Sequence, residues 1–178
     1  MSEELTVDEL GKNLQECADY LRGAVDKGEY KDYILPLVFY AEMNRRFQEH
    51  YEEELEEVGY EIESDDSELD EAIREIAAEE TAQGIQVPPG YSWEQIRTFG
   101  TDRFNEDAVD ESDEDKGVAG FIDSAFLKFE ETNDEYSGVF EDRYATVGSF
   151  QGDDGDQRLR NVIDVIDSAL YRESRDVP

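Results

Sequence analysis

The sequence predicts an all-α domain, a helical bundle around a central apolar helix with irregular, aromatic-containing connections. Apolar residues recur at helical spacing in several segments, which is typical of amphipathic helices. Residues 33–43 form the densest apolar run in an otherwise acidic chain. No segment shows the alternating pattern of a strand, and no internal repeat is present.

The central helix is expected to open near Glu29 and to end between Glu57 and Gly59. Because residues 33–43 are apolar on nearly every side, we expect them to be buried with other helices packed around them. Pro36 falls inside this helix and removes one backbone hydrogen bond. A kink or a break is therefore predicted near Tyr33.

The first helix is expected to begin near Thr6, where Thr6 and Glu9 match a capping box, and to continue to Val25 before a turn at residues 26–28. After a polar gap at residues 64–67, a third helix is predicted from Leu69 to Ala77. Residues 87–90 contain two prolines and cannot be helical.

Ser92 resembles the N-cap of a short helix that holds Trp93 as a core anchor. Residues 101–116 are mostly acidic and predict a solvated loop or a weak helix, whereas residues 118–131 predict a helix. Residues 135–150 lack a clear period, and their aromatic side chains are expected to order them. A turn is predicted at residues 153–156 and a last helix at 159–170.

At 178 residues one domain is the default, and the net charge of −33 is its most unusual property. Forty-nine acids face sixteen bases, and only five bases are lysines: Lys12, Lys27, Lys31, Lys116 and Lys128. The acids occur in every segment, which argues against an acidic tail. Adaptation to concentrated salt is favoured over a DNA mimic whose carboxylates stand in for phosphates. Salt at about 1 M shortens the screening length to roughly 3 Å, which removes most of the self-repulsion.

Residues that often carry chemistry have simpler explanations in this chain. Cys17 is alone, so no disulfide forms within the chain, and its helical spacing predicts a small buried residue. His50 lies on a Glu-rich helix surface and is expected to be exposed. The acid pairs at residues 65–66 and 153–154 do not fit a calcium loop, and no phosphate-binding glycine motif occurs, so no catalytic, cofactor or metal site is predicted.

The basic residues are few, and four of the sixteen form two pairs. Arg45–Arg46 and Arg158–Arg160 are interpreted as partners in surface ion pairs. The N-terminus lacks the features of a signal peptide, and no apolar run approaches the ~20 residues that span a bilayer. We therefore expect a protein without a membrane association, in the cytoplasm.

One stretch resembles a known family. Leu14, Ala18, Asp19, Leu21, Arg22 and Gly23, followed by EYKDYILPLVF at residues 29–39, are similar to the N-terminal helical domain of type I restriction-modification methyltransferase (M) subunits. Later landmarks follow in the family's order: Val87-Pro88-Pro89 before Trp93, Gly138-Val139-Phe140, and the closing helix at residues 159–170. The family often has Lys-Arg soon after the apolar run, whereas this chain has Ala41-Glu42.

The resemblance implies that residues 1–178 are the non-catalytic N-terminal domain of a DNA adenine-N6 methyltransferase subunit, with the catalytic domain downstream. The acidic, lysine-poor composition indicates that the protein comes from a halophile. The parent protein is expected to use S-adenosylmethionine and to assemble with specificity and restriction subunits. The domain is expected to help enclose DNA within that complex. By this resemblance, Arg22, Lys31, Arg45 and Arg46 are the residues expected to contact DNA or another subunit.

Two alternatives remain open at this point. A free-standing DNA mimic would fold at low salt and would inhibit DNA-binding enzymes. A helical adaptor would bind only a protein partner and would have no role with nucleic acid.

Overall fold

The all-α prediction is confirmed. The computed structural model describes residues 7–58, 67–81, 84–114, 116–140 and 144–171, and these contain α-helices and short 3-10 turns without a strand. The α-helices are α1 (Val7–Leu21), α2 (Tyr30–Val58), α3 (Ser67–Glu80), α4 (Trp93–Thr98), α5 (Glu111–Glu114), α6 (Val118–Thr132) and α7 (Gly152–Leu170). The 3-10 turns are η1 (Lys27–Glu29), η2 (Glu106–Ala108), η3 (Asp134–Tyr136), η4 (Tyr144–Thr146) and η5 (Gly148–Phe150).

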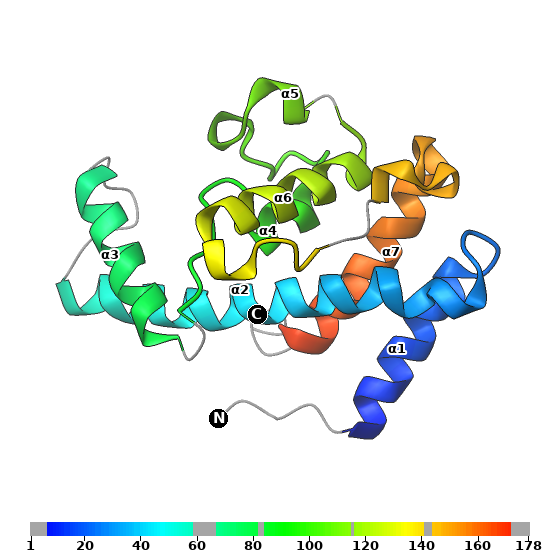
Figure 1. The fold of residues 1–178 in the computed structure, drawn as a ribbon, viewed down its shortest axis with the longest axis horizontal. Coiled ribbons are helices and arrows are strands. Elements are labelled where there is room, and N and C mark those ends of the chain that lie inside the picture. The colour runs from blue at the N-terminus through cyan, green and yellow to red at the C-terminus, as the bar shows by residue number, and fades with distance from the viewer. Residues whose placement is uncertain (1–6, 59–66, 82–83, 115, 141–143, 172–178) are drawn as a thin grey trace.

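Helix α2 is the central element, as predicted, and runs along the length of the molecule with α1 and α3 near its two ends (Figure 1). Within residues 33–43 only Leu35 is exposed, whereas Leu37 and Tyr40 are fully buried. Of the kink or break predicted near Tyr33, the break is wrong, because α2 continues from Tyr30 through Pro36. Pro36 lies close to the start of the helix and has no N–H to donate. Only one carbonyl in the first turn of α2 therefore lacks its helical hydrogen bond. Packing on both sides of the proline then holds the helix together.

The main core is built around aromatic rings from α2, α6 and the segment that follows α6. The Tyr40 ring packs on those of Phe126 and Phe129, with centroids 5.2 and 5.4 Å away. Phe140 stacks on Phe126 at 4.0 Å, and the Tyr144 hydroxyl donates to the Tyr33 carbonyl at 2.6 Å. These contacts confirm that aromatic side chains order the irregular connection after α6.

A second, smaller hydrophobic cluster joins the far end of α2 to α3. Phe47, Ala77, Ala78 and Val87 are buried in it, with Tyr51 packed against them. The Arg74 guanidinium lies over the Tyr51 ring at 4.8 Å and donates to the Val87 carbonyl at 3.3 Å. The helix predicted at residues 69–77 is confirmed, and it pairs with α2 to form a helical hairpin beside the main core (Figure 1).

Two helix boundaries differ from the predictions, and glycine explains both. Helix α1 ends at Leu21 and not at Val25, since Gly23 adopts a left-handed φ of 83° that terminates it. Helix α7 begins at Gly152, so the turn predicted at residues 153–156 is wrong. Gly155 lies directly against the backbone of Phe150, where a side chain would not fit. The glycine therefore permits close packing inside the helix instead of ending it.

The other boundaries agree with the sequence. Helix α2 ends at Val58 within the predicted window, residues 87–90 are not helical, and Ser92 caps α4 by accepting the Gln95 N–H at 3.3 Å. The predicted capping residue Thr6 and the polar gap up to residue 66 lie outside the described residues.

Candidate functional site

The four basic residues expected to make contacts do not converge on one site. Lys31 lies in the first turn of α2, and Arg45 lies 14 residues later, about 21 Å along a straight helix. Arg22 follows α1 and pairs with Asp19 at 2.9 Å, with both side chains largely exposed. Lys31 is exposed and forms no ion pair with a described residue.

The Arg45–Arg46 pair is held by acids of its own helix, as predicted. Arg45 binds Glu42 through two hydrogen bonds of 2.7 and 3.0 Å, and Arg46 reaches the same carboxylate at 3.0 Å. Arg45 also lies 3.2 Å from Glu49. Burial would raise the pKa of Glu42, but hydrogen bonds from the two arginines outweigh it and lower that pKa. Both guanidinium charges are thus largely compensated within α2.

Arg158 and Arg160 differ from their predicted role. Neither forms an ion pair with a described residue. Arg158 donates to the Ser149 carbonyl at 2.8 Å, and Arg160 donates to the Phe99 carbonyl at 3.1 Å. Among the described residues, these two arginines therefore tie α7 to neighbouring segments through backbone carbonyls and not through the predicted surface ion pairs.

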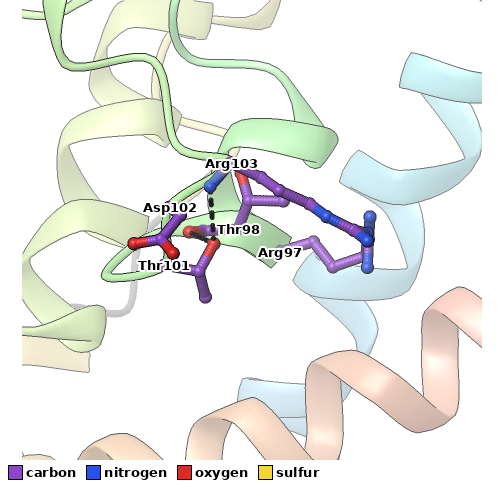
Figure 2. Close-up of a pocket in the computed structure, with 5 residues that line it drawn as sticks. All are labelled: Arg97, Thr98, Thr101, Asp102 and Arg103. Atoms are coloured by element: carbon purple, nitrogen blue, oxygen red, sulfur yellow. Dashed lines mark hydrogen bonds between the residues drawn. The ribbon is translucent and has the colours of Figure 1, made fainter.

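An open pocket of about 300 Å³ lies where α4 gives way to the following loop, and it is lined by Arg97, Thr98, Thr101, Asp102 and Arg103 (Figure 2). Gly100 has a φ of 82°, which reverses the chain at the end of α4. The Thr101 N–H donates to the Thr98 carbonyl at 2.9 Å, and the Arg103 N–H donates to the Thr101 hydroxyl at 3.3 Å. The reversal places Arg97 and Arg103 in one pocket although they are six residues apart in the chain.

The two pocket arginines have different surroundings. Arg97 is mostly buried and forms a two-bond pair with Glu94, at 2.6 and 3.1 Å, and its Nε lies 4.0 Å from Asp167. Arg103 is exposed and forms no ion pair with a described residue. No pattern in the sequence indicates this pair of arginines, since their proximity depends on the reversal at Gly100.

A buried polar network anchors the acidic segment that precedes α6. Asp113 accepts hydrogen bonds from the Tyr91 hydroxyl at 2.6 Å, from the Ser124 hydroxyl at 2.8 Å and from Lys116 at 2.8 Å. Burial would raise the pKa of Asp113, but these hydrogen bonds outweigh burial and lower the pKa. The hydrogen bond from Lys116 has the largest lowering effect. Burial also raises the pKa of Tyr91 to about 12. Residues 101–116 contain the short helix α5 (Glu111–Glu114) as well as loop. The acidic composition predicted a solvated segment, but Asp113 is buried.

Trp93 is a core anchor, as predicted. It is fully buried, its indole N–H donates to Asp167 at 3.0 Å, and its backbone N–H donates to the Asn44 side chain at 2.8 Å. These bonds join α4 to both α7 and α2. They place the end of α4, and with it Arg97, at a fixed position relative to the core.

Cys17 and His50 show no arrangement typical of catalysis. Cys17 is buried, as expected, and burial raises the pKa of its thiol to about 12, which keeps it protonated. His50 is half-buried, less exposed than expected, with its Nδ1 atom 3.7 Å from Glu53. Asp153 and Asp154 are exposed in the first turn of α7, and residues 65–66 lie outside the described part. Among the described residues no group of three or more metal-ligating side chains is gathered.

Comparison with known proteins identifies the family. No match to the chain was found among curated proteins. Within the described part of the chain, no helix is long and apolar enough to span a membrane. The model of the HsdM N-terminal domain matches residues 10–166, a range that extends from α1 into α7 and includes the resembling stretch at residues 14–39. The chain therefore belongs to the family of N-terminal domains of the methyltransferase subunit of type I restriction-modification systems.

Proposed function

We propose that this chain is a non-catalytic domain that helps the methyltransferase subunit to enclose DNA and to contact the other subunits of the restriction-modification complex. The observation that carries the proposal is the family match over residues 10–166. The parent protein transfers a methyl group from S-adenosylmethionine to N6 of adenine, and a catalytic domain downstream of this chain binds that cofactor. The partners are the specificity and restriction subunits, in the cytoplasm.

The charge of the domain limits how it takes part in DNA binding. A net charge of −33 repels the phosphate backbone, and phosphate contacts weaken steeply as salt rises. Three of the four basic residues named by the resemblance already have acid partners on the same segment. The domain therefore contributes a few local contacts within the assembly, while other subunits supply most of the affinity.

The same composition supports adaptation to a salt-rich cytoplasm. Exposed acids occur on α1, on the far half of α2 and on α3, and not on one face alone. This distribution fits a surface that stays hydrated in concentrated salt, and it fits less well a mimic that presents one continuous row of carboxylates. We propose that the protein comes from a halophile.

Removal of the domain from the complete methyltransferase tests the proposal. The full-length subunit and a variant without residues 1–178 are each assembled with the specificity subunit in about 2 M KCl. We expect the truncated subunit to retain S-adenosylmethionine binding, measured by calorimetry, and to lose DNA affinity and adenine methylation by at least about tenfold. Unchanged methylation would refute the proposed role. Loss of cofactor binding would show instead that the domain belongs to the catalytic unit.

A further inference from the structure

We propose that the pocket between Arg97 and Arg103 binds a phosphate oxyanion, which in the assembled complex is a phosphodiester group of the DNA backbone. The inference rests on the proposed function, because it names the place where this domain touches DNA. None of the four residues expected from the family resemblance lies in this pocket.

The shape of the pocket brings two guanidinium groups to one place. Figure 2 shows the side chains of Arg97 and Arg103 extending to the same side of the pocket, away from Asp102. A guanidinium presents a planar fork of N–H donors that matches two phosphate oxygens. Two such groups on one pocket wall can therefore hold a single phosphate between them.

The two threonines shape the turn and are not the ligands. The Thr98 hydroxyl donates to the Glu94 carbonyl at 2.7 Å, and the Thr101 hydroxyl donates to the Thr98 carbonyl at 2.6 Å. Because both hydroxyl protons are engaged with the backbone, they fix the loop and leave the arginines to bind the anion. The turn is further held from α7, where Arg160 donates to the Phe99 carbonyl and packs against Gly100.

The charges around the pocket favour Arg103 as the residue that captures the anion. Arg103 has no ion pair among the described residues and extends into solvent, so a phosphate meets no competing carboxylate on it. Arg97 already holds Glu94 through two hydrogen bonds and lies 4.0 Å from Asp167, so it adds a secondary contact at most. Asp102, Glu94 and Asp167 oppose an anion at this place. We therefore expect weak binding of a lone phosphate and a contact that positions DNA instead of selecting its sequence.

The first test measures phosphate binding by the 178-residue chain. Inorganic phosphate is titrated at constant ionic strength, set with KCl, while NMR follows the backbone and arginine side-chain N–H signals. We expect saturable shifts at residues 97–103. The variant R103Q should weaken the phosphate affinity about tenfold, since it removes one charge-assisted donor fork. The matched control is K12Q, because Lys12 is also an exposed cation without an ion pair to a described residue, and it lies on α1 outside the pocket and outside the four residues named by the resemblance. Its affinity should stay within about twofold of wild type.

The second test uses duplex DNA and the complete methyltransferase with its specificity subunit. R103Q should weaken DNA binding, uniformly across sequences, and should lower the slope of log affinity against log salt by about one, whereas K12Q should not. Absence of phosphate shifts at residues 97–103 would overturn the site. If phosphate binds there but R103Q leaves DNA binding unchanged, the pocket takes a free phosphate and its assignment to DNA is overturned.

These results separate the pocket from the proposed function. DNA binding that is lost on removal of residues 1–178, but not in R103Q, overturns the pocket and leaves the domain's role standing. Phosphate binding that depends on Arg103, together with normal methylation by the truncated subunit, supports the anion site and refutes the role in enclosing DNA.

Discussion

Replacement of Asp113 by asparagine should destabilise the domain, because the carboxylate is buried and accepts three hydrogen bonds. Its donors are Tyr91, Ser124 and Lys116. An asparagine of the same size presents an NH2 group to at least one of these donors and carries no charge. A hydrogen bond to a charged group contributes about 1.5–3 kcal/mol. The Lys116 side chain is 43% exposed and rehydrates when released. The remaining two bonds give an expected loss of about 3–6 kcal/mol.

The matched control is Asp110→Asn, in the same acidic segment. Asp110 pairs with Lys128 at 3.2 Å, but its side chain is 65% exposed, so its loss should cost under about 1 kcal/mol. Urea unfolding of both variants, followed by circular dichroism in about 2 M KCl, measures the free energy of unfolding. The reasoning is refuted if Asp113→Asn is no less stable than Asp110→Asn.

The comparison of wild type with Asp113→Asn also gives a prediction for the effect of pH on stability. The folded state lowers the pKa of Asp113 below its ordinary value, so its stabilisation is complete above the unfolded pKa of about 3.9 and is lost as the pH falls through the lowered folded value. The difference in stability between wild type and Asp113→Asn should therefore be constant near neutral pH and should shrink in acid below about pH 4. A difference that grows in acid would contradict this assignment.

Three further outcomes are expected. Trp93→Phe keeps the buried ring but removes the N–H that Asp167 accepts, so urea unfolding should show a loss of about 1–3 kcal/mol. Gly90→Ala places a side chain against the Ala108 carbonyl at a φ of 84°, and it should lower the thermal midpoint far more than Gly138→Ala, where φ is 82° but the surrounding space is open. The thermal midpoint should rise between 0.1 and 2 M KCl, since salt screens the net charge of −33; a flat or falling midpoint would contradict salt adaptation.

Local patterns predicted the elements whose structure depends mainly on neighbouring residues. The apolar density of residues 33–43 identified the central helix, and Ser92 before Trp93 identified the start of α4. In both places the helical periodicity, the capping residue and the buried face agree. The break predicted near Tyr33 does not form, because the effect of Pro36 is confined to the beginning of a helix that tertiary packing stabilises.

The parts that were missed depend on contacts between distant segments. The acidic composition of residues 101–116 gave no sign that Asp113 would be buried, since its partners Tyr91 and Ser124 lie 22 and 11 residues away. The pocket at Arg97 and Arg103 needs the left-handed turn at Gly100 and the support of α7. The pattern of residue types along the chain therefore predicts neither the burial of Asp113 nor the pocket at Arg97 and Arg103.

The placement of the cations also explains why the domain would bind DNA only within an assembly. Lys116 and Lys128 hold the acidic segment to the core, the first through Asp113 and the second through Asp110. Since so many bases serve the fold, few charges remain for DNA. At low salt the net charge repels a duplex, and at high salt a single phosphate contact is screened. The proposed contact at Arg103 would therefore act only where other subunits already hold the DNA, and there it would fix the position of the domain on the backbone.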